Sequence, residues 1–98
     1  MTLPLHLHPA VRGEIDDGYR WYERRQTDLG RDFLDAVDRV LAAIMANPFQ
    51  FGFADADIRE GLLSRFPYAI YYRVLADRIR VLAVYHTARD PSGWQSRA

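Results

Sequence analysis

The side chains best suited to chemistry in this 98-residue chain lie in its last third. Arg65, Arg73, His86 and Arg89 are the candidates. A histidine can transfer a proton near neutral pH and an arginine can stabilise developing negative charge, so together they could cleave a phosphodiester bond. The same side chains can equally form the polar rim of a protein interface. The sequence shows no second strong base and no nucleophile beside them. Both interpretations therefore stay open, and binding is favoured over catalysis.

Two other groupings could bind a metal ion only with additional ligands. His6 and His8 would share one face of a short strand, and Asp55 and Asp57 have the same i, i+2 spacing in a later segment. No third ligand lies near the histidines in the sequence. A calcium loop needs several more oxygen ligands at regular spacing. We therefore expect no metal site and no cofactor.

The candidate residues are positioned by a predicted β-hairpin. Two apolar, β-branched and aromatic runs, residues 68–75 and 79–86, flank a polar turn at 76–78. Successive side chains of a strand point to opposite faces. The face expected to pack on the helices comprises Ile70, Tyr72, Val74, Ile79, Val81, Ala83 and Tyr85. The face expected to be exposed or to contact a partner comprises Tyr71, Arg73, Leu75, Arg80, Leu82, Val84 and His86. Arg73 and His86 should therefore share the outward face.

A short strand and two helices are expected before this hairpin. Residues 3–9 alternate between leucine and other side chains, which is typical of a half-buried strand. Pro9 suits the first turn of a helix, and apolar residues recur at helical spacing to about residue 26. Asp28 is a suitable N-cap for a second helix, which the Asn-Pro pair at 47–48 ends. The short link between them predicts an antiparallel helical hairpin.

The remaining segments complete one domain of the α+β class over residues 1–98. The aromatic stretch 49–53 and the residues 54–57 that follow it indicate a loop, and residues 58–66 indicate a further strand. A short turn or helix containing Trp94 follows the hairpin. The expected order is β-α-α-β-β-β, with the helical hairpin packed on a small, mainly antiparallel sheet.

Composition excludes several classes of protein. Without cysteine there can be no disulfide or thiolate metal site. No apolar run approaches the roughly 20 residues that span a bilayer, so a cytoplasmic protein without membrane contact is expected. Thirteen arginines balance thirteen acidic residues, and there is no lysine. Proteins that bind nucleic acid through its phosphates usually carry excess positive charge. Sequence-specific DNA binding by this chain alone is therefore not expected, although a local basic patch remains open.

Several motifs in their order resemble the RelE/ParE toxin superfamily of bacterial type II toxin–antitoxin systems. They are RFPYAIYYRV at 65–74, IRVLAVYH at 79–86 and RDP at 89–91 followed by Trp94. The upstream YRWYE at 19–23 resembles the helical hairpin of that family. The resemblance covers nearly the whole chain. It implies the same fold as the pattern of elements, and a cognate antitoxin whose C-terminal segment wraps around the toxin.

The two branches of this superfamily act on different targets. RelE-like members are small ribonucleases that cut mRNA on the ribosome with a cluster of Lys and Arg plus a Tyr or His, whereas ParE-like members poison DNA gyrase. Ala69 stands where ribonuclease members often carry arginine, and the HxxRDP ending at 86–91 is closer to the ParE branch. The resemblance therefore implies a plasmid-stabilisation type of toxin that inhibits gyrase by protein binding and is neutralised by a ParD-like antitoxin. An mRNA interferase using Arg65, Arg73, His86 and Arg89 is the alternative, and a non-toxic partner-binding member is the second.

The antitoxin is expected to place an amphipathic helix in the groove between the helical hairpin and the sheet. Candidate lining residues are Trp21, Tyr22 and Phe33. The full set of candidate partner-binding residues is Trp21, Tyr22, Phe33, Tyr71, Arg73, Arg80, His86, Arg89 and Trp94.

Overall fold

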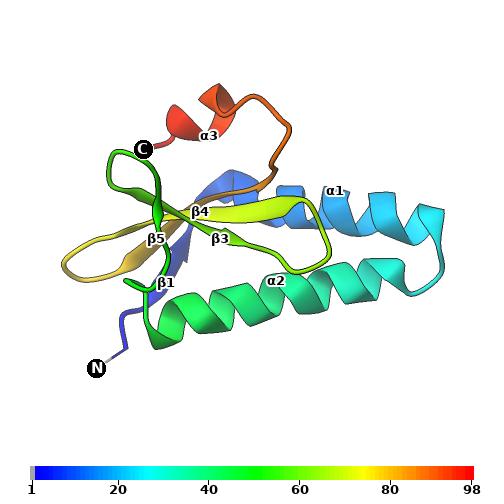
Figure 1. Ribbon diagram of the computed structural model, residues 1–98, viewed down its shortest axis with the longest axis horizontal. Coiled ribbons are helices and arrows are strands. Elements are labelled where there is room, and N and C mark those ends of the chain that lie inside the picture. Colours follow the sequence, from blue (N-terminus) through cyan, green and yellow to red (C-terminus); the bar gives the residue numbers. More distant parts are fainter. Residues whose placement is uncertain (1) are drawn as a thin grey trace.

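A computed structural model describes residues 2–98 and confirms the α+β class and the order of elements (Figure 1). The elements are β1 (Leu5–Leu7), α1 (Pro9–Arg25), α2 (Leu29–Ala46), β2 (Phe53–Asp55), β3 (Ile58–Leu62), β4 (Tyr68–Val74), β5 (Ile79–His86) and α3 (Ser92–Gln95). Strand β2 lies within the segment predicted to be a loop and was therefore not predicted. Strand β3 ends four residues earlier than predicted, because the chain turns before Pro67.

The five strands form one mixed sheet in the order β1-β5-β4-β3-β2. β1 runs parallel to β5, and the other pairs are antiparallel. The predicted hairpin of β4 and β5 therefore lies at the centre of the sheet, with the short strands β1 and β2 at its two edges.

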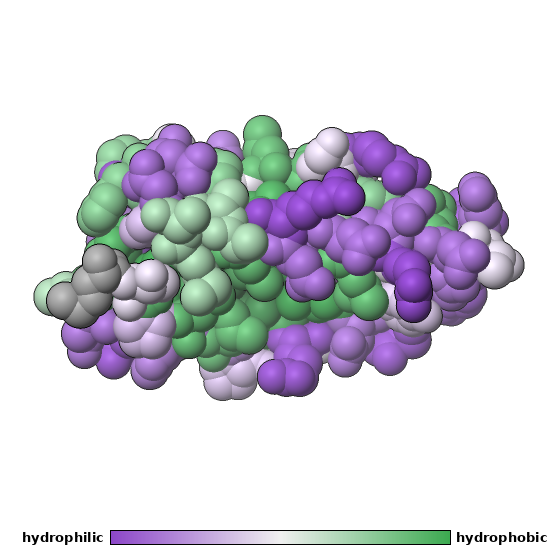
Figure 2. Space-filling model, turned by 90° about the horizontal axis from the view of Figure 1, so that it is seen from below, coloured by the Kyte–Doolittle hydropathy of each residue, from purple (hydrophilic) through white to green (hydrophobic). Residues whose placement is uncertain are grey.

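The helices α1 and α2 cover one face of the sheet and enclose the larger core. The fully buried side chains of this core include Val11, Phe33, Val37, Ile44, Ile70, Tyr72, Ile79 and Val81. Gly18 allows the close approach of α1 to α2, because a Cβ atom there would lie 2.6 Å from the Phe33 ring. Figure 2 shows the molecule from below, where an area of apolar side chains is bordered by polar side chains. Partly buried apolar residues that pack on the core include Leu3, Leu5, Ile15, Leu34 and Leu41.

The N-terminal end of α2 follows the N-cap residue Asp28 and is held by the side chain of Glu23. Asp28 adopts a left-handed conformation with φ 71° and makes no side-chain capping hydrogen bond. The Glu23 carboxylate instead accepts hydrogen bonds from the backbone N–H groups of Asp28, at 3.1 Å, and Gly30, at 3.0 Å. Asp28 is therefore the N-cap residue, as predicted, but its side chain does not cap the helix.

The opposite face of the sheet, which we call the outer face, is covered by α3. Trp94 stacks on Tyr71 with ring centroids 4.1 Å apart and an interplanar angle of 11°. A second buried cluster, the outer cluster, comprises Ile58, Ala69, Tyr71, Leu82, Ala83, Tyr85 and Trp94. Buried apolar side chains therefore lie on both faces of the central part of the hairpin.

The pairing of β4 with β5 contains a β-bulge. Tyr71 pairs with Ala83. The next residue, Tyr72, pairs with Val81, which leaves Leu82 as an extra residue of β5. A bulge of this kind interrupts the alternation of side chains. As a result, Leu82 and Ala83 both belong to the outer cluster.

Beyond the bulge, the predicted faces of β5 are reversed. Val84 joins the helix-side core, and Tyr85 joins the outer cluster. His86 pairs with Tyr68, which packs on the helix-side core, so His86 also lies on that side. The prediction that Arg73 and His86 share a face is therefore wrong, because one inserted residue changes the parity of the strand. Between the turn and the bulge the predicted faces are confirmed.

Two charged side chains satisfy the backbone of the bulge. β1 ends at Leu7, opposite Val81, so the next part of the β5 edge has no neighbouring strand. The Glu14 carboxylate accepts a hydrogen bond from the Val84 N–H at 3.0 Å, and Arg97 Nη1 donates to the Leu82 carbonyl at 3.0 Å. The two side chains also form an ion pair at 2.8 Å and are 12% and 16% exposed, respectively. This pair connects α1, the bulge and the segment after α3.

We expect Tyr72→Phe to destabilise the protein by about 1–1.5 kcal/mol at pH 7, because the buried hydroxyl donates to the Pro48 carbonyl at 2.7 Å. Burial raises the pKa of Tyr72 to about 12, against a smaller lowering by Arg59. The folded protein thus holds this proton more tightly than the unfolded chain. Its contribution to stability is complete below about pH 10 and is lost as the pH rises through about 12. Urea unfolding between pH 7 and 11 should show that the free energy of unfolding falls less steeply with rising pH in Tyr72→Phe than in the wild-type protein. The same decrease in both proteins would contradict this.

Candidate partner-binding site

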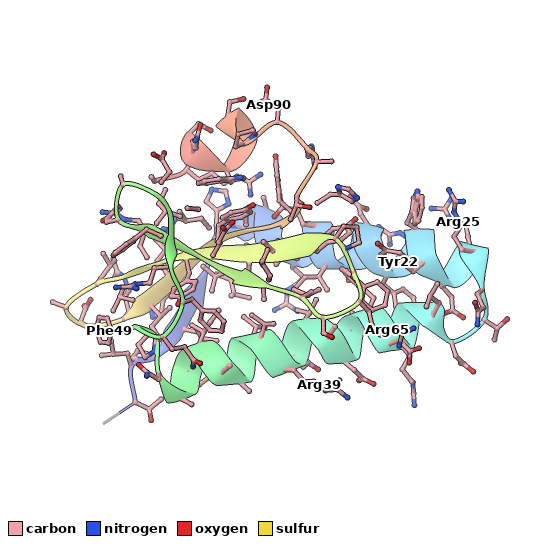
Figure 3. The ribbon with its side chains drawn as sticks, in the orientation of Figure 1. Tyr22, Arg25, Arg39, Phe49, Arg65 and Asp90 are labelled. Atoms are coloured by element: carbon pink, nitrogen blue, oxygen red, sulfur yellow. The ribbon has the colours of Figure 1, made fainter. Side chains whose placement is uncertain are left out.

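A pocket of about 210 Å³ lies between α1 and the central hairpin. Trp21 and Tyr22 line it from the C-terminal half of α1, and Tyr68 and His86 line it from the paired ends of β4 and β5. Tyr22 lies at the end of the molecule where α1 meets α2 (Figure 3). The β-bulge is the reason that His86 reaches this pocket, because unbroken alternation would have placed it on the outer face.

Aromatic contacts hold the walls of the pocket in place. Tyr22 packs edge-on against Trp21, with ring centroids 5.1 Å apart, and against Tyr68 at 6.1 Å. The Tyr68 and His86 rings are 5.3 Å apart. The Arg25 guanidinium lies 3.9 Å from the centre of the Trp21 ring. Trp21 is nevertheless 48% exposed, so a large aromatic surface remains accessible.

The two tyrosine hydroxyls of the pocket are uncharged at neutral pH. Burial raises the pKa of Tyr68, while Arg89 lowers it and Asp17 raises it less strongly. Burial, and then the neighbouring Tyr68, raise the pKa of Tyr22. His86 Nδ1 accepts a hydrogen bond from the Ala88 N–H at 3.1 Å, so a neutral imidazole carries its proton on Nε2. An apolar wall with a few hydrogen-bonding groups suits the anchoring side chain of a protein partner.

Three predicted partner-binding residues are buried. Phe33 is fully buried behind Tyr22, with ring centroids 5.3 Å apart, so it supports the pocket without lining it. Tyr71 and Trp94 are 6% and 4% exposed because Trp94, a residue of α3, stacks on Tyr71. None of the three presents a free surface to a partner in this conformation.

None of the predicted arginines lines the pocket. Arg73 is opposite Arg80 on the outer face, and its guanidinium binds Asp57 through Nε at 3.0 Å and Nη2 at 2.9 Å. The Arg89 guanidinium lies 4.4 Å from the centre of the Tyr85 ring. Only His86 of the possible ribonuclease residues lines the pocket.

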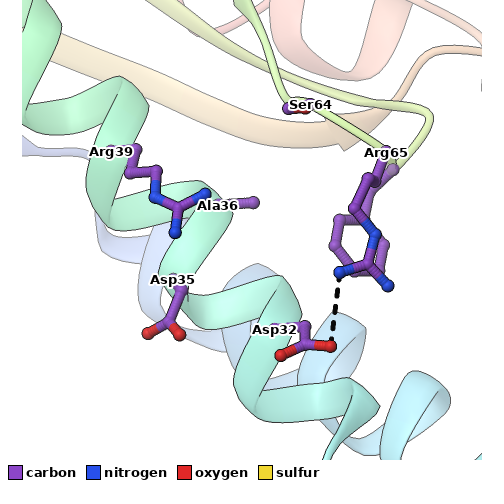
Figure 4. A pocket seen from close by; sticks show the side chains of 7 residues that line it. Asp32, Asp35, Ala36, Arg39, Ser64 and Arg65 are labelled. Carbon is purple, nitrogen blue, oxygen red and sulfur yellow. Dashed lines mark hydrogen bonds and ion pairs between the residues drawn. The ribbon is translucent and has the colours of Figure 1, made fainter.

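Arg65 is the fourth of those residues and lies in the turn between β3 and β4. Its Nη1 is 3.3 Å from Asp32 Oδ2 on α2, at a shallow hollow of about 60 Å³ (Figure 4). Asp35, Arg39 and Ser64 line the same hollow. This small site mixes both charges and brings none of the other candidate residues to Arg65.

We expect Arg65→Gly to stabilise the fold by about 0.5–1 kcal/mol. Arg65 has φ 72°, a left-handed conformation that costs a non-glycine residue about 1 kcal/mol or more. Its ion pair with Asp32 is exposed on both sides and contributes little. Thermal unfolding should therefore show a higher Tm for the glycine variant than for Arg65→Ala, which keeps the strained backbone. A lower Tm for the glycine variant would show that the arginine side chain stabilises the turn.

Neither potential metal-ligand pair gains a third ligand. Within residues 2–98 the structure has no group of three or more His, Asp or Glu side chains that could hold a metal ion. His8 caps α1, since its Nδ1 accepts a hydrogen bond from the Ala10 N–H at 3.1 Å. In the same part of the chain, none of the helices has the length and apolar character needed to cross a membrane.

Comparison with known proteins identifies the family. The model of the ParE toxin of the type II toxin–antitoxin system parDE matches residues 5–91. This chain belongs to the ParE toxin family. The resemblance to the ParE branch seen in the sequence is thereby confirmed, and the protein has the role of a toxin in a toxin–antitoxin system.

A solved structure shares the ParE-type fold. The chromosomal ParDE system from P. aeruginosa contains a chain that matches with a TM-score of 0.64 and 20% identity, over 87% of this chain and 96% of that one. At this level of identity the match shows the fold alone. No curated protein matches the sequence.

Sequence reasoning missed Tyr68, Glu14 and Arg97. Tyr68 has the same parity as Ile70 and Tyr72 on β4, so its position on the helix side could have been inferred. Glu14 and Arg97 are charged residues without a distinguishing pattern, and only the three-dimensional structure brings them to the bulge.

Proposed function

We propose that this member of the ParE family inhibits DNA gyrase by binding it as a protein partner and that a ParD-like antitoxin neutralises it. Membership of the ParE family supports the toxin role. The observation that carries a binding mechanism is the separation of Arg73 and His86 on opposite faces of the sheet. The toxin would act in the cytoplasm, where its proposed target works.

The geometry disfavours the alternative of an mRNA interferase. A general base and a cationic group must both reach one scissile phosphate. Here the Arg73 guanidinium is already bound by Asp57, and His86 lies across the sheet from it. Ala69, at the position where ribonuclease members often carry arginine, is fully buried in the outer cluster.

We place the main antitoxin contact at the pocket formed by Trp21, Tyr22, Tyr68 and His86. An amphipathic helix of the antitoxin would insert one large apolar side chain between these rings, in the helix-in-groove mode. The cavity of about 210 Å³ has the size of such a side chain, and the tyrosine hydroxyls and His86 Nε2 could bind polar groups beside it.

The test is a gyrase supercoiling assay with the purified protein, alone and with the antitoxin encoded beside it. We expect inhibition of supercoiling by the toxin, reversal by the antitoxin, and intact mRNA in a translation extract. The variants Arg73→Ala and His86→Ala test the alternative, because each removes one residue that an mRNA interferase would need. Cleavage of ribosome-bound mRNA that is lost in either variant would overturn the proposal in favour of the interferase.

A further inference from the structure

Two exposed phenylalanines and one arginine form a structured surface at the β2 edge of the sheet, which we call the aromatic clamp. It comprises Phe49, Phe53 and Arg59. The Arg59 guanidinium lies 4.1 Å from the centre of the Phe53 ring and 5.6 Å from that of Phe49. The two rings are 59% and 63% exposed, among the most exposed large apolar side chains in residues 2–98.

The clamp is held in place by hydrogen bonds from the sheet. Arg59 Nη1 donates to the carbonyl oxygens of Phe51, at 2.6 Å, and Phe49, at 3.3 Å. The buried Tyr72 hydroxyl holds the preceding carbonyl, that of Pro48. The loop that carries Phe49 is therefore tied to β3 and β4, and the exposure of its ring does not result from a loose chain. Aromatic residues and arginine are also the residue types enriched in the cores of protein interfaces.

The charges around the clamp favour a protein partner over a nucleic acid. Within residues 2–98, Arg59 forms no ion pair, so a carboxylate of a partner can bind its guanidinium. The zero net charge of the chain points the same way.

We propose that the aromatic clamp is the surface that contacts the target of the toxin, and that it takes an apolar protein segment bearing a carboxylate. Phe49 and the pocket residue Tyr22 lie toward opposite ends of the molecule, which is 41 Å long (Figure 3). The clamp and the pocket are therefore separate surfaces that can be altered independently. The assignment of the clamp to the target rests on the proposed function, in which the antitoxin occupies the pocket.

The experiment compares the double variant Phe49→Ser/Phe53→Ser with Leu62→Ser as the matched control. Leu62 is 60% exposed but lies on the outer face, opposite Ala69. Both purified proteins are checked for folding by thermal unfolding. We expect the double variant to need about tenfold more protein for half-inhibition of gyrase and to lose growth arrest on expression, with antitoxin affinity within about twofold of wild type. The control should behave as wild type in all three assays.

Different failures of this experiment contradict different proposals. If the double variant folds and still arrests growth as wild type does, the clamp is not the target surface. The assignment would also be overturned if the double variant lost antitoxin affinity as strongly as it lost gyrase inhibition. It would likewise be overturned if the wild-type protein bound DNA in the absence of gyrase and the double variant did not. If wild type leaves gyrase unaffected while the double variant abolishes growth arrest, the clamp stands and the proposed gyrase target fails. A wild type without growth arrest would overturn both.

Discussion

Replacement of Glu14 by alanine is expected to destabilise the protein by about 2–3 kcal/mol, because it leaves the mostly buried charge of Arg97 without its partner. Arg97 would remain 16% exposed beside the bulge with no carboxylate, and the Val84 N–H would lose its acceptor. Either loss alone is costly in a site from which water is largely excluded. Urea unfolding at pH 7 measures the effect.

The double variant Glu14→Met/Arg97→Met is the control, because it removes both charges and leaves neither one unpaired. A buried ion pair replaced by apolar side chains of similar volume often leaves stability unchanged or higher. We therefore expect the double variant to be more stable than Glu14→Ala, with a remaining loss of about 1–3 kcal/mol from the unpaired Val84 N–H and Leu82 carbonyl. Glu14→Gln keeps an acceptor for Val84 and should lie between them. A loss below about 1 kcal/mol in Glu14→Ala would show that the bulge does not depend on this pair.

The helices and the central hairpin could be predicted because their patterns are local. Pro9 and Asn47-Pro48 limit the helical hairpin, and the polar turn at 76–78 divides two apolar runs. Parity along β5 could be determined only near the turn, where Arg80 alternates with Ile79 and Val81. Beyond it, residues 81–85 are all apolar, since α1 and α2 cover one face and α3 covers the other. An unbroken apolar run gives no sign of an inserted residue.

The candidate site was predicted in parts but not as a whole. Trp21 and Tyr22 were assigned as candidate lining residues of an antitoxin groove, and His86 was selected for its chemistry. Only the bulge brings His86 to the same pocket. Trp94 was assigned to a partner-binding surface. The sequence did not reveal its burial, because that burial depends on α3 folding back onto Tyr71. That contact depends on the path of the chain after β5, which no local pattern records.

A smaller aromatic wall should weaken antitoxin binding strongly. Trp21→Ala is expected to lower antitoxin affinity about 30- to 1000-fold, the range of a tryptophan at the centre of a protein interface. The side chain is 48% exposed in the free protein, packs on Tyr22 and carries Arg25 on its face, so a partner bound in the pocket would cover it. Because its ring lies at the surface and not in the core, the Tm of the variant should change little. Isothermal titration calorimetry with the purified antitoxin measures the affinity.

Two further variants show whether this loss belongs to the pocket. Tyr68→Phe keeps the wall and removes one hydroxyl, so we expect a loss of about tenfold or less. Leu62→Ala removes an equally exposed apolar side chain from the outer face and should leave the affinity unchanged. Antitoxin binding by Trp21→Ala as tight as that of wild type would place the antitoxin elsewhere on the toxin. Loss of gyrase inhibition together with antitoxin binding would show that the pocket serves both partners, because the two surfaces would then not be separate.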